Sequence, residues 1–353
     1  MKIIVAIDSF KGSASSKELN EACREAILEV LPEAEVSLFP IADGGEGSLE
    51  ALSQALSVEK ISLPTRDLLG RPVQASYIIV ERSAFIESAS VVGLDFIEPS
   101  SETFNKASSF GLGELIQDAI EKGCRDIYLS LGGTGSSDGG FGLLESLGFD
   151  FDSLEFKSEI DWGQITITGL ADVTNPYYGE KGFAKVFGPQ KGGTAKQIEA
   201  KDEEACAFAR RMKEERGIDL QEFTGSGAAG GLGAAILIMG GQLKPGFETI
   251  AEWIGLEKAL ENADLIFTGE GKLDAQSQGG KVPVAISQMG KRFSVPTIAL
   301  CGSVEDNQSL EDHFLATFSI QRSFLSLEEA VDKEVTLTNV RHTVRSIIKS
   351  RFQ

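Results

Sequence analysis

Residues 1–19, MKIIVAIDSFKGSASSKEL, contain a strand, a loop and the start of a helix. Ile3–Ile7 is a continuous apolar run, mostly β-branched, which is typical of a strand buried on both faces of a sheet. After a loop rich in Gly and Ser, Ser15 and Glu18 have the spacing of a capping box, which marks the beginning of a helix. A strand, a loop and a helix in this order are typical of a parallel α/β sheet.

Strand, loop and helix patterns recur along the rest of the chain. Short apolar runs predict further strands at residues 36–39, 127–131, 165–171, 265–268, 297–300 and 317–320. Helical patterns lie between them, including a polar helix at 194–216 and a helix of small residues at 228–239. Residues 61–100 differ, because they have the pattern of strands joined by turns. We therefore expect a largely parallel sheet covered by helices on both faces, with a β-rich insertion at 61–100.

Length and composition restrict the class of protein. A chain of 353 residues is long enough for about two domains. Hydrophobic residues make up 42% and charged residues 24%, which is the usual mix of a soluble globular protein and excludes disorder, collagen and coiled coil. Glycine is enriched, with 39 of 353 residues against an average of about 7%. The glycines cluster in loops, so they point to sites where the backbone must turn or approach a ligand closely.

The charge excludes some partners. A net charge of −20 without any Lys/Arg-rich block argues against nucleic acid as a partner. No apolar run approaches the ~18 residues of a membrane span, so we expect no membrane partner. Four scattered cysteines without a CxxC motif fit a reducing, cytoplasmic location. With only two histidines, a metal site of several histidines is nearly excluded, and an anionic substrate would need a local cation or metal.

Several loops share one design, in which glycines and an acid stand between a strand or apolar segment and a helix. These loops are Asp8–Ser13, Asp43–Gly47, Gly132–Gly140, Asp172–Gly179 and Thr268–Asp274. Glycine lets the backbone approach an anion, helix N-termini present free N–H groups, and carboxylates can hold Mg²⁺. The combination fits phosphoryl transfer to a small acid. Each acid could instead form an Asx turn or cap a helix, and for Asp138 the two interpretations are about equally balanced.

Two short motifs leave alternatives open, and no Walker A sequence is present. Gly225–Gly230 fits GxGxxG, but the preceding segment is polar and not a convincing strand. A dinucleotide site, a phosphate cradle and the close packing of a Gly/Ala helix therefore all remain open for it. Gly135–Gly139 fits the GxSxG pattern of hydrolases, although three residues separate it from the preceding strand.

As a set, the loops resemble those of the bacterial type-1 glycerate kinase family. The similar stretches are Asp8–Ser13, Pro40–Gly47, Gly132–Gly140, Asp172–Pro176, Val186–Gly192, Gly225–Gly233, Thr268–Ser277 and Gly280–Pro283. They occur in the order of the family and extend over about the first 300 residues. The resemblance implies an enzyme, an ATP-dependent kinase that uses Mg²⁺ to convert D-glycerate to phosphoglycerate, with 2-phosphoglycerate favoured.

The resemblance also implies two unlike α/β domains, one of them Rossmann-like with a mainly parallel sheet and the other with a mixed sheet, and an active site in the cleft between them. Because 61–100 is rich in strands, we assign it with 151–255 to the second domain. The Rossmann-like domain then consists of residues 1–60, 101–150 and 256–353.

The loop chemistry and the resemblance together imply a set of candidate site residues. The candidate catalytic acids or bases are Asp43, Asp172 and Asp274. The candidate metal ligands are Glu46, Asp138 and Glu270. The candidate residues for binding substrate or phosphate are Ser9, Lys11, Gly132, Gly133, Asn175, Lys191, Gly227, Gly230, Lys272, Gln276, Ser277 and Lys281.

Two other classes of protein stay open from the sequence alone. One is a small-anion or nucleotide sensor that binds without turnover, and the other is a nicotinamide-dependent hydroxyacid dehydrogenase. Acids in five loops favour the kinase over a sensor, because binding alone would not need so many. D-glycerate and ATP are thus the expected small-molecule partners, and a monomer and a homodimer are equally compatible with the sequence.

Overall fold

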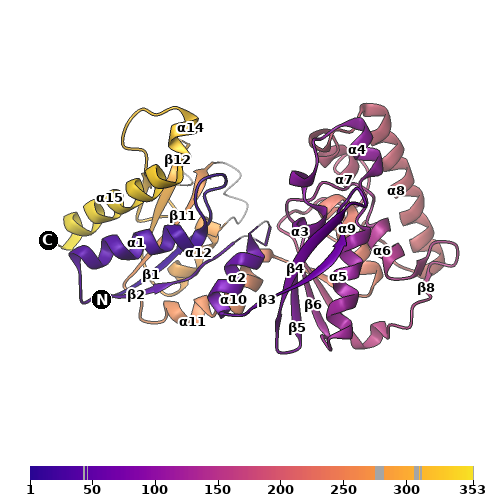
Figure 1. Cartoon of the computed structure of the whole chain (residues 1–353), viewed down its shortest axis with the longest axis horizontal. Coiled ribbons are helices and arrows are strands. Elements are labelled where there is room, and N and C mark those ends of the chain that lie inside the picture. The colour runs from indigo at the N-terminus through magenta and orange to yellow at the C-terminus, as the bar shows by residue number, and fades with distance from the viewer. Residues whose placement is uncertain (43, 46, 275–281, 306–309, 311, 353) are drawn as a thin grey trace. The chain divides into compact units, whose positions relative to one another are not determined.

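The computed structural model describes residues 1–42, 44–45, 47–274, 282–305, 310 and 312–352. The chain divides into two compact units. Unit 1 contains residues 1–43, 50–57 and 247–353, and unit 2 contains residues 44–49 and 58–246. In Figure 1, unit 1 combines the indigo N-terminal and the orange to yellow C-terminal segments, and unit 2 contains most of the purple to pink chain.

Unit 1 is built on a parallel sheet of five strands in the order β13-β12-β11-β1-β2. Its strands are β1 (Lys2–Ile7), β2 (Glu35–Leu38), β11 (Leu265–Leu273), β12 (Thr297–Val304) and β13 (Ala316–Ser319). Its helices are α1 (Ser16–Val30), α2 (Ser48–Leu56), α10 (Gly246–Trp253), α11 (Leu256–Leu260), α12 (Val282–Arg292), α14 (Leu327–Ala330) and α15 (Lys333–Phe352), and the first residues of α2 and α10 belong to unit 2.

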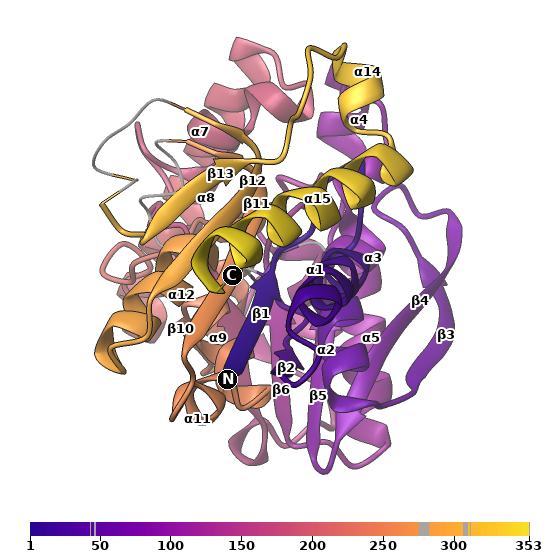
Figure 2. The same ribbon diagram turned by 90° about the vertical axis from the view of Figure 1, so that its left-hand side faces the viewer.

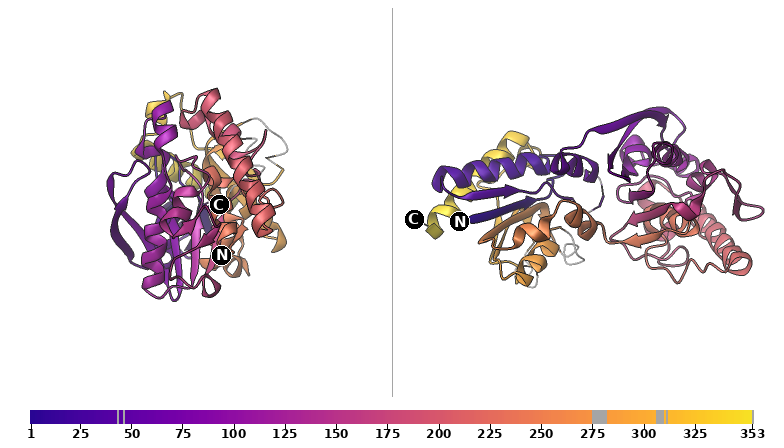
Figure 3. Two further views of the ribbon diagram at one scale, coloured as in Figure 1. Left: turned by 90° about the vertical axis from the view of Figure 1, so that its right-hand side faces the viewer. Right: turned by 90° about the horizontal axis from the view of Figure 1, so that it is seen from below.

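Helices cover both faces of this sheet. Alternate residues of β1 explain the arrangement, because Ile3 and Val5 pack against α1 and α15 while Ile4 and Ala6 pack against α10, α11 and α12. Figure 2 shows α1 and α15 side by side over the sheet, and the right panel of Figure 3 shows the sheet between two helical layers. The capping box predicted for Ser15 and Glu18 is present at the start of α1. The mainly parallel sheet expected from the strand–loop–helix order is therefore confirmed.

Unit 2 is built on a mixed sheet of six strands in the order β10-β9-β6-β5-β4-β3. β3, β4 and β5 pair antiparallel, whereas β5, β6, β9 and β10 pair parallel. Its strands are β3 (Lys60–Arg66), β4 (Pro72–Val80), β5 (Ser83–Glu87), β6 (Asp126–Ser130), β9 (Thr166–Leu170) and β10 (Gln242–Lys244), with β7 (Phe149–Asp150) and β8 (Glu155–Phe156) forming a separate pair. The mixed sheet expected for one of the domains is confirmed.

The helices of unit 2 enclose one continuous hydrophobic core. They are α3 (Ala89–Val92), α4 (Ser101–Lys106), α5 (Phe110–Glu121), α6 (Phe141–Ser146), α7 (Phe183–Phe187), α8 (Ala195–Arg216) and α9 (Ala228–Ile238), with short 3₁₀ turns η1 (Leu94–Phe96), η2 (Trp162–Gln164) and η3 (Pro189–Lys191). α5 packs on β3, β4 and β5, and α9 packs against β9 and β10. In the left panel of Figure 3, the helices and strands of unit 2 face the viewer.

The structure corrects the predicted domain division. Residues 101–150, assigned from the sequence to the domain of residues 1–60, lie in unit 2, where β6 pairs with β5 and β9. Residues 44–49 also belong to unit 2, and residues 247–255 belong to unit 1. The reason is physical: a strand buried on both faces has the same apolar pattern in either sheet, so its sequence does not identify the neighbours with which it pairs.

Candidate functional site

The sheet of unit 1 has a topological switch point between β1 and β11. From β1 the chain continues to β2 on one side, and from β11 it continues to β12 and β13 on the other. Ile7 pairs in register with Gly269, so the next residues, Asp8 and Glu270, are neighbours where β1 ends. Ligands of open α/β sheets bind outside the carboxyl ends of the strands at such a point. Unit 1 therefore presents two acids where this fold binds ligands.

The loop after β1 brings a cation to the same edge. The backbone N–H of Ser9 donates to Asp8 Oδ1 at 2.7 Å. Phe10–Ala14 is a tight turn in which Phe10 N donates to Ala14 O at 2.9 Å, and Gly12 supplies the φ of +75° that the turn requires. Lys11 is exposed on this turn. The turn thus presents an ammonium group just beyond the strand.

A second cation lies at the carboxyl end of β11. Lys272 Nζ is 3.2 Å from Asp274 Oδ2, and the Lys272 side chain is 65% exposed whereas that of Asp274 is 17% exposed. Glu270, on the same strand, is only 8% exposed. The candidate residues that unit 1 brings to this edge are Ser9, Lys11, Glu270, Lys272 and Asp274. Asp43, Glu46, Gln276, Ser277 and Lys281 lie outside the described residues.

In unit 2, Gly44 and Gly45 lie against the carboxyl ends of parallel strands. A Cβ on Gly132, two residues after β6, would lie 2.5 Å from Gly45 Cα. A Cβ on Gly44 would lie 2.7 Å from Gly246 Cα and 3.5 Å from the Cβ of Leu170, at the end of β9. These approaches are too close for any side chain, so they explain the glycines physically.

Glu87, the last residue of β5, holds the beginning of α2. Its Oε1 accepts a hydrogen bond from Gly47 N at 3.1 Å and its Oε2 accepts one from Leu49 N at 2.9 Å. A carboxylate at the first turn of a helix satisfies N–H groups that have no partner within the helix. Glu87 was not among the candidate residues predicted from the sequence. Its position was the sequence signal that could have identified it, because an acid at the end of an apolar run also occurs at Asp8, directly after β1.

We expect Glu87→Gln to lower kcat/KM by about 10- to 100-fold, because an amide can accept only one of the two hydrogen bonds and the segment that follows Asp43 and Glu46 would shift. Steady-state kinetics on the folded variant measures this effect. Glu102→Gln is the matched control, since Glu102 is exposed and pairs with Lys106 at 2.8 Å. Wild-type kinetics in Glu87→Gln would contradict a positioning role.

The candidates after β9 make mainly structural contacts. Asp172 is exposed, and its Oδ1 accepts a hydrogen bond from Gly246 N at 2.8 Å. Asn175 Nδ2 donates to Lys181 O at 2.8 Å, and Asn175 O accepts from Gly227 N at 3.0 Å. Asn175 therefore closes its own loop and joins it to the segment before α9.

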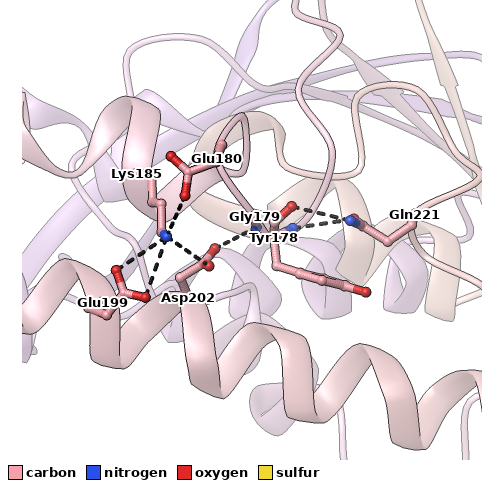
Figure 4. Close-up of polar contacts among 7 residues, drawn as sticks. All are labelled: Tyr178, Gly179, Glu180, Lys185, Glu199, Asp202 and Gln221. Atoms are coloured by element: carbon pink, nitrogen blue, oxygen red, sulfur yellow. Dashed lines mark hydrogen bonds and ion pairs between the residues drawn. The ribbon is translucent and has the colours of Figure 1, made fainter.

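A polar network fixes the far end of this loop against α8, as Figure 4 shows. Lys185 Nζ lies 2.9 Å from Glu180, 3.2 Å from Glu199 and 3.7 Å from Asp202, and hydrogen bonds to Glu180 and Glu199 raise its pKa. Asp202 Oδ1 also accepts from Gly179 N at 2.7 Å. The loop that begins with Asp172 is consequently held at both ends.

The contacts of the GxGxxG segment agree with close packing, one of the three interpretations open from the sequence. A Cβ on Gly227 would lie 2.2 Å from Pro176 O, and one on Gly230 would lie 2.1 Å from Ser136 O. Gly230 also has a φ of +68°, and its carbonyl accepts from Gly139 N at 2.9 Å. Left-handed φ values at residues 229–231 interrupt the beginning of α9. In the GxSxG pattern, Ser137 is 1% exposed, whereas a hydrolase nucleophile must be accessible.

Asp138, a predicted metal ligand, makes structural contacts in unit 2. Its Oδ2 accepts hydrogen bonds from the N–H and the hydroxyl of Ser109 at 2.7 and 2.8 Å and from Gly142 N at 3.1 Å. Its Oδ1 accepts from Gly140 N at 3.1 Å. The carboxylate thereby joins the N-termini of α5 and α6, the helix-capping alternative raised for it from the sequence.

Lys191 lies in a small pocket beside the glycines that follow β6. It is 2% exposed, and its Nζ donates to Ser136 O at 2.5 Å. The pocket has a volume of about 180 Å³, and its lining includes Gly132, Gly133, Thr134 and Lys191. Burial lowers the pKa of Lys191 to about 8, and the charge of Asp138 opposes this shift. Of the cations predicted from the sequence and described here, Lys191 is buried whereas Lys11 and Lys272 are exposed.

No cluster of three or more His, Cys, Asp or Glu side chains suited to a metal ion occurs among the described residues. The helices in the described part of the chain are also too short or too polar to cross a membrane.

Comparison with known proteins identifies close relatives over the whole chain. The glycerate kinase family model matches residues 3–351. A protein of Bacillus cereus named glycerate kinase is 36% identical, covering 98% of this chain and 97% of its own length. A protein of Escherichia coli K12 named glycerate 2-kinase is 34% identical over 94% of this chain and 93% of its own length. A crystal structure described as that of a glycerate kinase 2 from Salmonella typhimurium LT2 matches 99% of this chain and 98% of its own, with a TM-score of 0.86 and 34% identity.

Proposed function

Since the chain belongs to the glycerate kinase family, it is a kinase that phosphorylates glycerate, and we propose that it does so with ATP and Mg²⁺ to give 2-phosphoglycerate. The name of the Escherichia coli relative, glycerate 2-kinase, supports the 2-hydroxyl as the acceptor. A cytoplasmic location is part of the proposal, and the cysteines, all free thiols, are consistent with a reducing compartment.

The observation that carries the proposal is the switch point between β1 and β11 in unit 1. A nucleotide triphosphate bound with Mg²⁺ needs carboxylates for the metal and cations for the phosphate oxygens. Asp8 and Glu270 are neighbours in register at this edge, and Lys11 and Lys272 are exposed on the segments that follow. We therefore propose that this edge binds the phosphates of ATP, with Ser9 and the two lysines as donors.

The donor set at this edge fits Mg²⁺. Mg²⁺ bound together with phosphates usually takes only one or two protein carboxylates and keeps several waters. Asp8 and Glu270 match that requirement, and the absence of a larger cluster among the described residues does not oppose it. When bound, the metal would neutralise charge on the phosphate oxygens. Glu270 keeps the predicted role of metal ligand, and Asp8 joins it.

The acids Asp43, Asp172 and Asp274 remain the proposed candidates for the base that accepts the proton of the glycerate hydroxyl. Asp274 pairs with Lys272 at 3.2 Å, and Asp172 is exposed at the carboxyl end of β9. The variants Asp43→Asn, Asp172→Asn and Asp274→Asn separate them. The base is the residue whose loss lowers kcat while the KM values for ATP and glycerate change little.

A phosphorus NMR time course of the purified protein with ATP, Mg²⁺ and D-glycerate tests the proposal. We expect the signals of ATP to decline and a resonance matching authentic 2-phosphoglycerate to grow, because the phosphoryl group moves from the nucleotide to the 2-hydroxyl. Samples without glycerate or with excess EDTA are the controls, and both should stay unchanged. A resonance matching 3-phosphoglycerate would contradict the proposed acceptor, and turnover in EDTA would contradict the requirement for Mg²⁺.

A further inference from the structure

We propose that the pocket around Lys191 in unit 2 binds the carboxylate of the acceptor acid, so that it selects small carboxylic acids as substrates. The inference rests on the proposed function and deepens it, because it assigns one part of the substrate to one described site. It depends on the isolation of a buried cation, on the size of the pocket and on the chemistry of its walls.

The first argument is the isolated charge of Lys191. The ammonium group has three N–H donors, and Ser136 O at 2.5 Å is its hydrogen-bond acceptor among the described residues. No acidic side chain in the described part of the chain forms an ion pair with it. Asp138, whose charge acts on it, is engaged with Ser109, Gly140 and Gly142. A buried ammonium with one carbonyl acceptor and no paired charge is costly, and an anionic ligand supplies the missing charge and further acceptors.

The second argument is the polar surroundings of Lys191. Ser136 is 0% exposed, and its hydroxyl has no hydrogen-bond partner among the described residues. Gly132 and Gly133 line the pocket, and glycines let a ligand approach the backbone closely. A desolvated cation in the lining of a pocket is unusual in a folded protein and points to a ligand.

The third argument is size. The pocket volume of about 180 Å³ is below the 300–1,000 Å³ that is typical for drug-sized ligands. A three-carbon acid is far smaller than a drug-sized ligand. A nucleoside triphosphate is too large for this pocket. The pocket therefore suits the acceptor substrate and not ATP.

The fourth argument separates a carboxylate from a phosphate. Phosphate sites usually combine several donors, such as an arginine fork or several backbone N–H groups at a helix N-terminus. Among the described lining residues, Lys191 is the one charged group, and Thr134 and Gln190 are polar. Apolar walls are contributed by Leu94, Leu131, Val173 and Phe187. One positive charge matches the single negative charge of a carboxylate, and the apolar walls suit the carbon chain.

The test measures binding of D-glycerate by calorimetry in the absence of nucleotide, for wild type and Lys191→Met. Methionine keeps the length of the side chain and removes the charge. We expect glycerate to bind at least about 30-fold more weakly, as for the loss of one partner of a buried charge pair. The affinity for MgATP should change less than twofold, and the melting temperature should not fall. Lys106→Met is the matched control, because Lys106 is exposed and pairs with Glu102.

The pH dependence gives a second readout. The carboxylate binds the protonated ammonium, whose pKa in the free protein is about 8. The dissociation constant of glycerate for wild type should therefore rise about tenfold per pH unit above pH 8. In Lys191→Met this rise should be absent. The same comparison with glycolate, lactate and inorganic phosphate defines the ligand class, and we expect the two carboxylates to bind in a Lys191-dependent manner and phosphate to bind more weakly.

Three results would overturn the inference: glycerate binding that Lys191→Met leaves unchanged, an equal loss of MgATP binding, or tighter Lys191-dependent binding of phosphate than of glycerate. A melting temperature lowered by several degrees together with weaker binding of both ligands would also overturn it, in favour of a structural role. Failure of the proposed function is distinct, because wild type would then bind glycerate through Lys191 but produce no phosphoglycerate in the NMR experiment.

Discussion

Glu270→Gln should lower kcat by about 100-fold or more and raise the Mg²⁺ concentration needed for half-maximal rate. Glutamine fills the same space but cannot supply the negative charge that a bound Mg²⁺ requires at the carboxyl end of β11. Because Glu270 is 8% exposed and the replacement is nearly isosteric, we expect the fold to persist. Measurement of kcat at saturating ATP and glycerate over a Mg²⁺ titration tests this prediction.

Two further variants make the Glu270 experiment specific. Glu257→Gln serves as the control, since Glu257 is exposed in the same unit and pairs with Arg292 at 3.4 Å. Asp8→Asn should act on the same step, so the double variant with Glu270→Gln should be little worse than either single variant. If Glu270→Gln retained both kcat and the Mg²⁺ dependence of wild type, the proposed metal site at the switch point would be refuted.

Asp138→Ala should destabilise unit 2 by about 3–5 kcal/mol, because it removes a carboxylate that accepts four hydrogen bonds and leaves buried N–H groups of Ser109, Gly140 and Gly142 without a partner. The corresponding thermal transition should fall by roughly 10 °C. Thermal unfolding followed by circular dichroism measures this effect. In Asp152→Ala the transition should stay nearly unchanged, since Asp152 is exposed.

The kinetics of Asp138→Ala separate the structural role from the metal role predicted from the sequence. At a temperature where the variant is folded, the half-saturating Mg²⁺ concentration should equal that of wild type. An unchanged melting temperature combined with a higher Mg²⁺ requirement would instead support the metal role predicted from the sequence.

The sequence predicted local structure well where the pattern that indicates an element lies within the residues of that element. The capping box of Ser15 and Glu18 and the apolar run of β1 both depend on neighbouring residues, and both appear in the structure. The pairing of β6 depends on residues far away in the chain, and this is why segment 101–150 was assigned to the other domain. The apolar pattern of a strand predicts which of its faces are buried, but it does not identify the strands with which it pairs.

The candidate site shows the same limit at the level of single side chains. An acid in a glycine-rich loop has one sequence pattern whether it binds a metal or caps a helix, so the contacts that Asp138 makes with the N-termini of two helices could not be predicted from its sequence. Lys191 was predicted as a cation, but its burial and its isolation are properties of the packed loops around it. Glu87 was missed because its two partners, Gly47 and Leu49, lie far from it in sequence.

The interleaved order of the two units has a consequence for how the chain is made. Unit 2 occupies one nearly continuous stretch, Val58–Gly246, and its contacts are complete once that stretch has left the ribosome. In unit 1, β1 is a central strand whose neighbour β11 pairs through Ile3 with Leu265, so one edge of β1 stays open for more than two thirds of synthesis. We expect unit 2 to fold before unit 1 although the chain begins in unit 1. Strand β1 then waits for its partner β11, so its apolar edge is the point most vulnerable to aggregation or to chaperone capture.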